Sequence, residues 1–159
     1  MKRIILSLLT IISVEAFAQT DSITLYFEKL ISHNVRIPSA LYNDTCYFTS
    51  TLLKIGVNDQ YDLTTALFSD NAEVWLKSDL PRMKERIEKQ ILRGYCQKLG
   101  IKFKTIIIPV IIQSSPENCL SKTYSFRWNE NYLNFDKKAL RGSCIFVEPV
   151  MITLLVSVN

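Results

Sequence analysis

The sequence is poor in the residues that break or loosen a polypeptide chain. Its 159 residues include four glycines and five prolines, and no stretch is of low complexity. Hydrophobic residues make up 48% of the chain and charged residues 21%, which is the balance of a folded domain and not of a disordered segment. The formal net charge of +4 is too small to indicate nucleic-acid binding. We therefore expect one folded domain that does not bind nucleic acid.

Recognisable motifs for catalysis or metal binding are also missing. The sequence contains neither G-x-S-x-G nor C-x-x-C, which are typical of serine hydrolases and of redox or zinc sites. His33 is the only histidine, and its place at the end of a predicted helix favours a surface cap over a catalytic base. Glu85 and Glu88 alternate with basic residues, as on a solvated helix face. The sequence predicts no catalytic residue, cofactor or metal, so an enzyme is the less favoured interpretation.

The first 18 residues have the pattern of a cleavable secretory signal. Met1-Lys2-Arg3 is basic, residues 4–14 are uncharged and mostly apolar, and Ala16-Phe17-Ala18 offers an A-x-A cleavage site. The apolar run is shorter than the roughly 20 residues that a membrane-spanning helix requires. We expect residues 19–159 to act outside the cytoplasm, in the periplasm or the extracellular space, with no transmembrane segment. An uncleaved anchor or a buried first helix is the alternative.

Four cysteines are candidates for disulfide bonds. An even number in an exported chain fits two bridges. Cys119 with Cys144 is the preferred pair, because each lies beside a loop of the same C-terminal region. Cys96 falls on the apolar side of a predicted helix, where a buried free thiol is the alternative. The candidates are Cys46, Cys96, Cys119 and Cys144.

Hydrophobic periodicity predicts the elements of the domain. Apolar residues three and four positions apart indicate helices over residues 22–33 and 80–99. Runs rich in aromatic and β-branched residues indicate strands over residues 46–55, 61–68, 103–112, 122–128 and 144–158, with a turn at 56–60. Pro109 cannot donate to a strand ladder, so an edge or a bulge is expected there. We predict an α+β fold in which one long helix and one N-terminal helix pack on an antiparallel sheet of three or more strands.

The predicted helix 80–99 carries a basic stripe. Arg82, Arg86, Lys89 and Arg93 align on the side opposite its apolar residues. Such a stripe is a candidate for contact with an anionic surface, such as lipid headgroups, acidic glycan or an acidic protein. A solvated helix exterior explains the same pattern without any ligand.

The order of these elements resembles the TonB C-terminal domain family. The matching pieces are residues 27–38 with their Ile37-Pro38 ending, the hairpin 46–68, the helix 80–99 and Ile108-Pro109-Val110. The resemblance covers about residues 22–112, and residues 113–159 form a C-terminal strand extension without a counterpart. The sequence has Tyr42-Asn43-Asp44 where the family has a glycine, and it lacks the family's Trp-Pro stretch and Pro-rich spacer. The resemblance implies an export-side module that recognises partners by strand addition at a sheet edge.

Together these features favour a non-catalytic exported module that binds a protein or peptide partner in the cell envelope. Two other functions stay open. A carboxylate-dependent hydrolase of envelope polymer would need two acidic side chains that face each other in a pocket. A disulfide-stabilised surface protein would bind anionic material through the basic stripe. The oligomeric state does not follow from the sequence.

Overall fold

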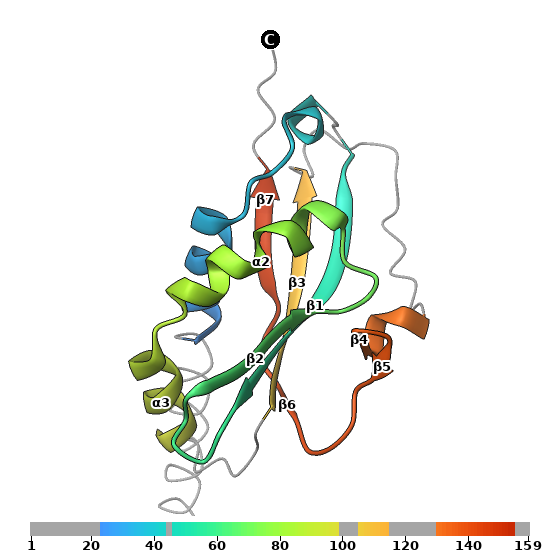
Figure 1. Ribbon diagram of the computed structural model, residues 1–159. Coiled ribbons are helices and arrows are strands. Elements are labelled where there is room, and N and C mark those ends of the chain that lie inside the picture. The colour runs from blue at the N-terminus through green and yellow to red at the C-terminus, as the bar shows by residue number, and fades with distance from the viewer. Residues whose placement is uncertain (1–22, 44–45, 99–104, 115–129, 155–159) are drawn as a thin grey trace, which may run out of the picture.

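The chain forms an α+β fold in which helices cover one face of a five-stranded sheet (Figure 1). The computed structural model describes residues 23–43, 46–98, 105–114 and 130–154. Within the sheet, β1 lies between β2 and β3, and both β6 and β7 pair with the other side of β3. The predicted fold class is therefore confirmed, although the sheet is mixed because β6 and β7 run parallel to β3.

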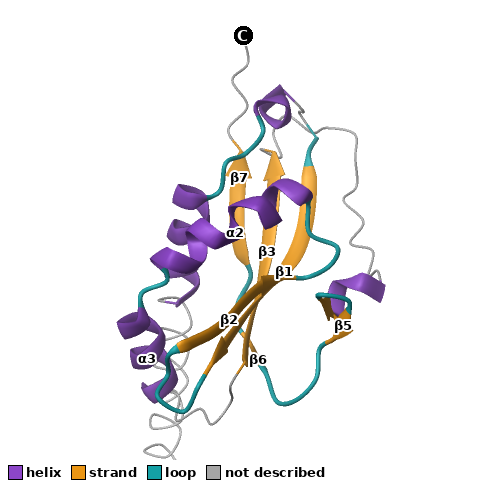
Figure 2. Ribbon diagram, in the orientation of Figure 1, coloured by secondary structure: helices purple, strands orange, loops and turns teal. Residues whose placement is uncertain are grey.

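Three helices and seven strands make up the described residues (Figure 2). The helices are α1 (23–34), α2 (Val74–Arg86) and α3 (Lys89–Lys98), with 3-10 turns η1 (Ser39–Asn43) and η3 (Glu130–Leu133). The strands are β1 (Phe48–Val57), β2 (Leu63–Phe68), β3 (Thr105–Ser114), β4 (Asn134–Phe135), β5 (Lys138–Ala139), β6 (Ile145–Phe146) and β7 (Val150–Leu154). The strand predicted over residues 122–128 lies outside the described residues.

The predicted hairpin is confirmed, but its turn comes later in the chain than expected. Gly56 belongs to β1, at the point where the register with β2 shifts. The turn is organised by Asn58, whose side-chain oxygen accepts the N–H groups of Gln60 at 2.9 Å and Asp62 at 2.8 Å. An Asn side chain that bonds the main chain two residues on is a turn device in its own right. The turn therefore needs no glycine, and Gly56 serves the close approach of the strands instead.

The prediction of one continuous helix over residues 80–99 is wrong. Helix α2 begins at Val74, so Pro81 lies inside it, and it ends at Arg86. Ile87 is extended, with φ −67° and ψ 112°, before α3 begins. The Tyr26 hydroxyl bridges this break, because it accepts the Glu88 N–H at 2.7 Å and donates to the Arg86 carbonyl at 3.4 Å. The break is stabilised by a side chain from α1, which helical periodicity in residues 80–99 does not reveal.

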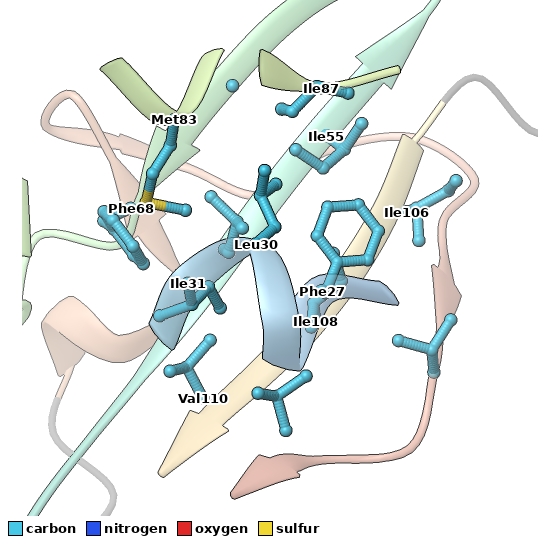
Figure 3. Close-up of a cluster of buried hydrophobic side chains, with 14 of the residues drawn as sticks. Phe27, Leu30, Ile31, Ile55, Phe68, Met83, Ile87, Ile106, Ile108 and Val110 are labelled. Atoms are coloured by element: carbon cyan, nitrogen blue, oxygen red, sulfur yellow. The ribbon is translucent and has the colours of Figure 1, made fainter. Parts of the chain in front are cut away.

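The main core lies between the helices and the sheet (Figure 3). Phe27, Leu30 and Ile31 of α1 lie over the sheet together with Met83 of α2. Each such buried side chain contributes about 1.5–3 kcal/mol relative to an exposed one. The strand residues that meet them alternate along each strand and include Ile55, Phe68, Ile106, Ile108 and Val110. This alternation leaves the intervening residues of each strand on the opposite face.

Pro109 lies in an interior strand, so the edge or bulge expected there is not formed. Its partner on β1 is Leu52. The Leu52 N–H donates to the Ser69 hydroxyl at 3.0 Å and its carbonyl accepts the Ser69 N–H at 2.8 Å, so both groups point away from β3. On the other side of β3, β6 ends at Phe146 and β7 begins at Val150. Pro109 therefore faces the gap between β6 and β7. No strand hydrogen bond is formed there, so the missing N–H of proline costs nothing.

The face of the sheet away from the helices has a smaller covering, here called the second face. Leu52 and Ile107 are buried there by Tyr132 of η3 and Phe135 of β4. The hairpin of β4 and β5 therefore packs on the sheet and is not a separate domain. The second face combines this small apolar cluster with polar and exposed positions, and it carries both surfaces considered below.

Candidate functional site

The long strand β1 offers no free edge where β2 ends. The side-chain amide of Asn71 donates to the Ser50 carbonyl at 2.8 Å. The Ser69 hydroxyl accepts the Leu52 N–H at 3.0 Å, and the Ser69 N–H donates to the Leu52 carbonyl at 2.8 Å. The chain between β2 and α2 thus satisfies main-chain groups that a further strand would otherwise use. This part of the sheet is closed by the protein itself, as exposed edges commonly are.

Strand β7 is a different case, because within the described residues it pairs only with β3. Val150, Ile152 and Leu154 are buried against the helices, whereas Met151 and Thr153 are exposed. An edge strand presents N–H and C=O groups to an incoming strand. The pairing therefore leaves β7 as a candidate site for strand addition.

Two apolar side chains accompany this edge on the second face. Phe146 of β6 and Met151 of β7 are each 51% exposed. They pair with Ile107 and Ile111 of β3, so they point to the same side of the sheet as those residues. Sequence reasoning missed them, because one apolar residue in a short strand gives no periodic signal. Met151 lies on the β7 edge itself, and Phe146 lies on the preceding strand β6.

The basic stripe is divided by the helix break. Arg82 and Arg86 lie on α2, and Lys89 and Arg93 lie on α3. Arg82 is 3.3 Å from the Asp79 carboxylate, Lys89 is 3.5 Å from that of Asp62, and Arg93 donates to the Gln60 carbonyl at 3.3 Å. Three of the four cations thus contact their own chain, although exposed pairs of this kind are weak. An anion-binding role for the stripe stays a prediction.

The structure does not contain the two disulfides expected from the cysteine count. Cys96 is buried and Cys144 is half-buried, and both are free thiols. The preferred pair of Cys119 with Cys144 is therefore not formed. The reason at Cys96 is its place on the core side of α3, where a thiol behaves as a small apolar group. Cys119 lies outside the described residues.

The side chains of His33 and Asp79 have structural partners, whereas those of Glu85 and Glu88 are exposed. The Nδ1 of His33 lies 2.7 Å from the Lys29 carbonyl oxygen, to which it can only donate, so this nitrogen cannot act as a base towards the neighbouring Ser32. Glu85 and Glu88 are exposed on the two sides of the helix break. Asp79 is buried, but its oxygens accept the Arg36 N–H at 2.6 Å and lie 3.3 Å from the Arg82 guanidinium. None of these contacts forms a nucleophile–base pair.

Comparison of the chain with models of protein families, with curated proteins and with solved structures finds no match. The resemblance to TonB C-terminal domains accordingly stays a prediction. Over the described ranges, no helix combines the length and the apolar character that crossing a membrane requires.

Proposed function

We propose that the chain is a non-catalytic exported module that takes up an extended segment of a protein partner as an additional strand beside β7. The observation that supports this function is the edge of β7, which pairs on one side only within the described residues and has Met151 and Phe146 exposed next to it. Export is supported by the signal pattern of residues 1–18, which lie outside the described part of the chain.

The edge also defines the kind of segment that it would bind. Main-chain hydrogen bonds to β7 would hold the segment, and its alternate side chains on the second face would lie beside Met151. These alternate side chains should therefore be apolar. Pro149 interrupts the edge before Val150, so the added strand is confined to the five residues of β7. A short edge of this kind also limits uncontrolled pairing between copies of the protein.

The proposal is tested by selecting binders for the mature protein from a library of short extended peptides. We expect the selected peptides to protect the main-chain amides of residues 150–154 from hydrogen exchange. Met151→Lys should weaken binding by about tenfold or more, because it places a charge in the apolar contact. Val74→Lys is the matched control, since Val74 is 80% exposed on α2, and it should leave the affinity unchanged.

A proline scan of a selected peptide separates strand addition from other modes of binding. Proline at every second position should abolish binding, because alternate N–H groups of an added strand face β7. Protection of a different surface, or no alternation in the scan, would contradict the proposal. A second copy of the chain is the competing occupant of the edge. A homodimer that Met151→Lys dissociates, in the absence of any selected peptide, would also overturn it.

A further inference from the structure

A cavity on the second face has cationic side chains at all but one of its described lining residues. Its volume is about 460 Å³, and its lining residues are Lys54, Lys137, Lys138, Ala139 and Arg141. This volume is within the range of sites that hold small molecules. None of these described lining residues belongs to β7, so the question of the cavity's ligand is separate from strand addition.

The cavity lies where β1 meets the hairpin of β4 and β5. Lys54 follows the buried Leu52 by two residues along β1, so both point to the second face. Its Nζ lies 5.5 Å from the centroid of the Phe135 ring, within the range of a cation–π contact. The aromatic side chain that anchors the hairpin on the sheet therefore also positions the first cation of the cavity.

The other cations follow from the tight turn of this hairpin. Asp136 and Lys137 have positive φ values of 53° and 59°, as the two central residues of a type I′ turn require. The Lys137 N–H donates to a carboxylate oxygen of Asp70 at 2.8 Å. The Leu140 N–H donates to the Leu133 carbonyl at 2.8 Å. These main-chain bonds hold Lys137, Lys138 and Arg141 around the same space as Lys54.

The four cations around the cavity form no ion pair within the described part of the chain. Among the described residues, no carboxylate lines it, and none of its four cations forms a salt bridge with another of them. The nearby Asp70 accepts the Lys137 N–H, and Asp136 is exposed at the turn. Four like charges around one space repel one another unless an anion lies between them. The basic stripe differs in this respect, since Arg82, Lys89 and Arg93 have contacts within the chain.

We infer that this cavity binds a compact ligand with two or more phosphate groups. A phosphate monoester carries a charge of about −1.5 to −2 near neutral pH, so two such groups balance four cations. Lysine binds phosphate as a point charge, and arginine can add two parallel hydrogen bonds. A carboxylate brings only one charge, so a ligand of this size would need four of them. The chemistry of the cavity therefore favours closely spaced phosphates.

The test is titration calorimetry of the mature protein with sodium tripolyphosphate. We expect saturable binding of one ligand per chain that weakens as salt is raised. Lys54→Gln, and separately the double variant Lys137→Gln/Lys138→Gln, should each weaken binding by about tenfold or more, since each loses charge-assisted hydrogen bonds. Lys137 and Lys138 are exposed, so the double variant should fold normally. The matched control is Lys29→Gln/Lys84→Gln on the helical side, with a change of no more than about twofold.

A second arm identifies the source of the phosphates. Phosphatidylcholine vesicles with and without cardiolipin, a lipid with two phosphates, are sedimented with the protein and its variants. Binding that depends on Lys54, Lys137 and Lys138 in either arm supports the site, and the arm in which it occurs distinguishes a soluble ligand from a lipid headgroup. Absence of such binding in both arms overturns the inference. Equal weakening by the helical control also overturns it, because net charge alone would then explain the binding.

Discussion

At the scale of single residues, Asp79 is the one carboxylate or basic side chain that is buried among the described residues. Its side chain lies on the core side of α2 and reaches the main chain just after α1. One carboxylate oxygen accepts the Arg36 N–H, and the other faces the Arg82 guanidinium. Asp79 thereby fixes the connection after α1 to α2, because a buried carboxylate is stable only with such partners.

We predict that the two partners of Asp79 differ in importance. Asp79→Ala should lower the free energy of unfolding by about 2–3 kcal/mol, because it leaves the Arg36 N–H without its charged acceptor. Arg82→Gln should cost less than about 1 kcal/mol, because its side chain is 34% exposed and the ion pair is screened by solvent. Urea unfolding of both variants measures the difference. Equal losses would show that the ion pair, and not the backbone contact, stabilises this junction.

At the scale of secondary-structure elements, the junction of α2 and α3 depends on one hydroxyl. In Tyr26→Phe, the aromatic ring can keep its edge-to-face contact with Phe27, whose centroid is 5.2 Å away. The Glu88 N–H loses its acceptor at 2.7 Å, so we expect a loss of about 1–2 kcal/mol in the free energy of unfolding. Hydrogen exchange should accelerate at Glu88 and in the first turn of α3. Uniform acceleration over the whole chain would contradict a local role.

This junction also shows how far the fold could be predicted from the sequence. Apolar periodicity identified α1, and runs of aromatic and β-branched residues identified the hairpin of β1 and β2 and most of β3, because each pattern is local. The helix break was missed because it depends on Tyr26, which is 60 residues from Arg86 in the chain. The parallel pairing of β7 was missed for a similar reason, since strand partners and their direction are set by tertiary contacts and not by propensity.

The candidate sites were less predictable than the fold. Charge periodicity found the stripe from Arg82 to Arg93, because its members belong to one stretch of sequence. The cavity combines Lys54 with residues 137–141, and neither segment is unusual alone. Only the packing of Phe135 on the second face brings their charges together. Convergent charge from distant segments leaves no periodic signal in a single sequence.

At the scale of the whole molecule, the two faces of the sheet have different roles. The helical face buries most of the apolar side chains and accounts for stability. The second face carries the small cluster around Leu52 and Ile107, the exposed Phe146 and Met151, and the cationic cavity. Alternation along the strands produces this division, because neighbouring residues point to opposite faces. Substitutions on the second face can therefore alter binding with little effect on the core.

The buried ionisable groups of the molecule predict how its stability depends on pH. Burial raises the pKa of the Cys96 thiol above its ordinary value of 9.0, and it raises the pKa values of Tyr95 and Tyr132 above 10.0. Burial is also the largest effect on Tyr26, whose pKa is raised although the Glu88 N–H bond opposes the change. In each case the unfolded state loses its proton at a lower pH than the folded state does.

The free energy of unfolding should therefore be insensitive to these groups below about pH 9 and should fall as the pH rises above it, because the unfolded state binds fewer protons there. Urea unfolding from pH 8 to pH 11 measures the slope. Tyr95→Phe removes one of the groups, so its slope above pH 10 should be shallower than that of the parent protein, whatever exposed lysines contribute to both. Identical slopes would show that Tyr95 ionises as readily in the folded protein as in the unfolded chain, and a rise in stability with pH would contradict the burial of all four groups.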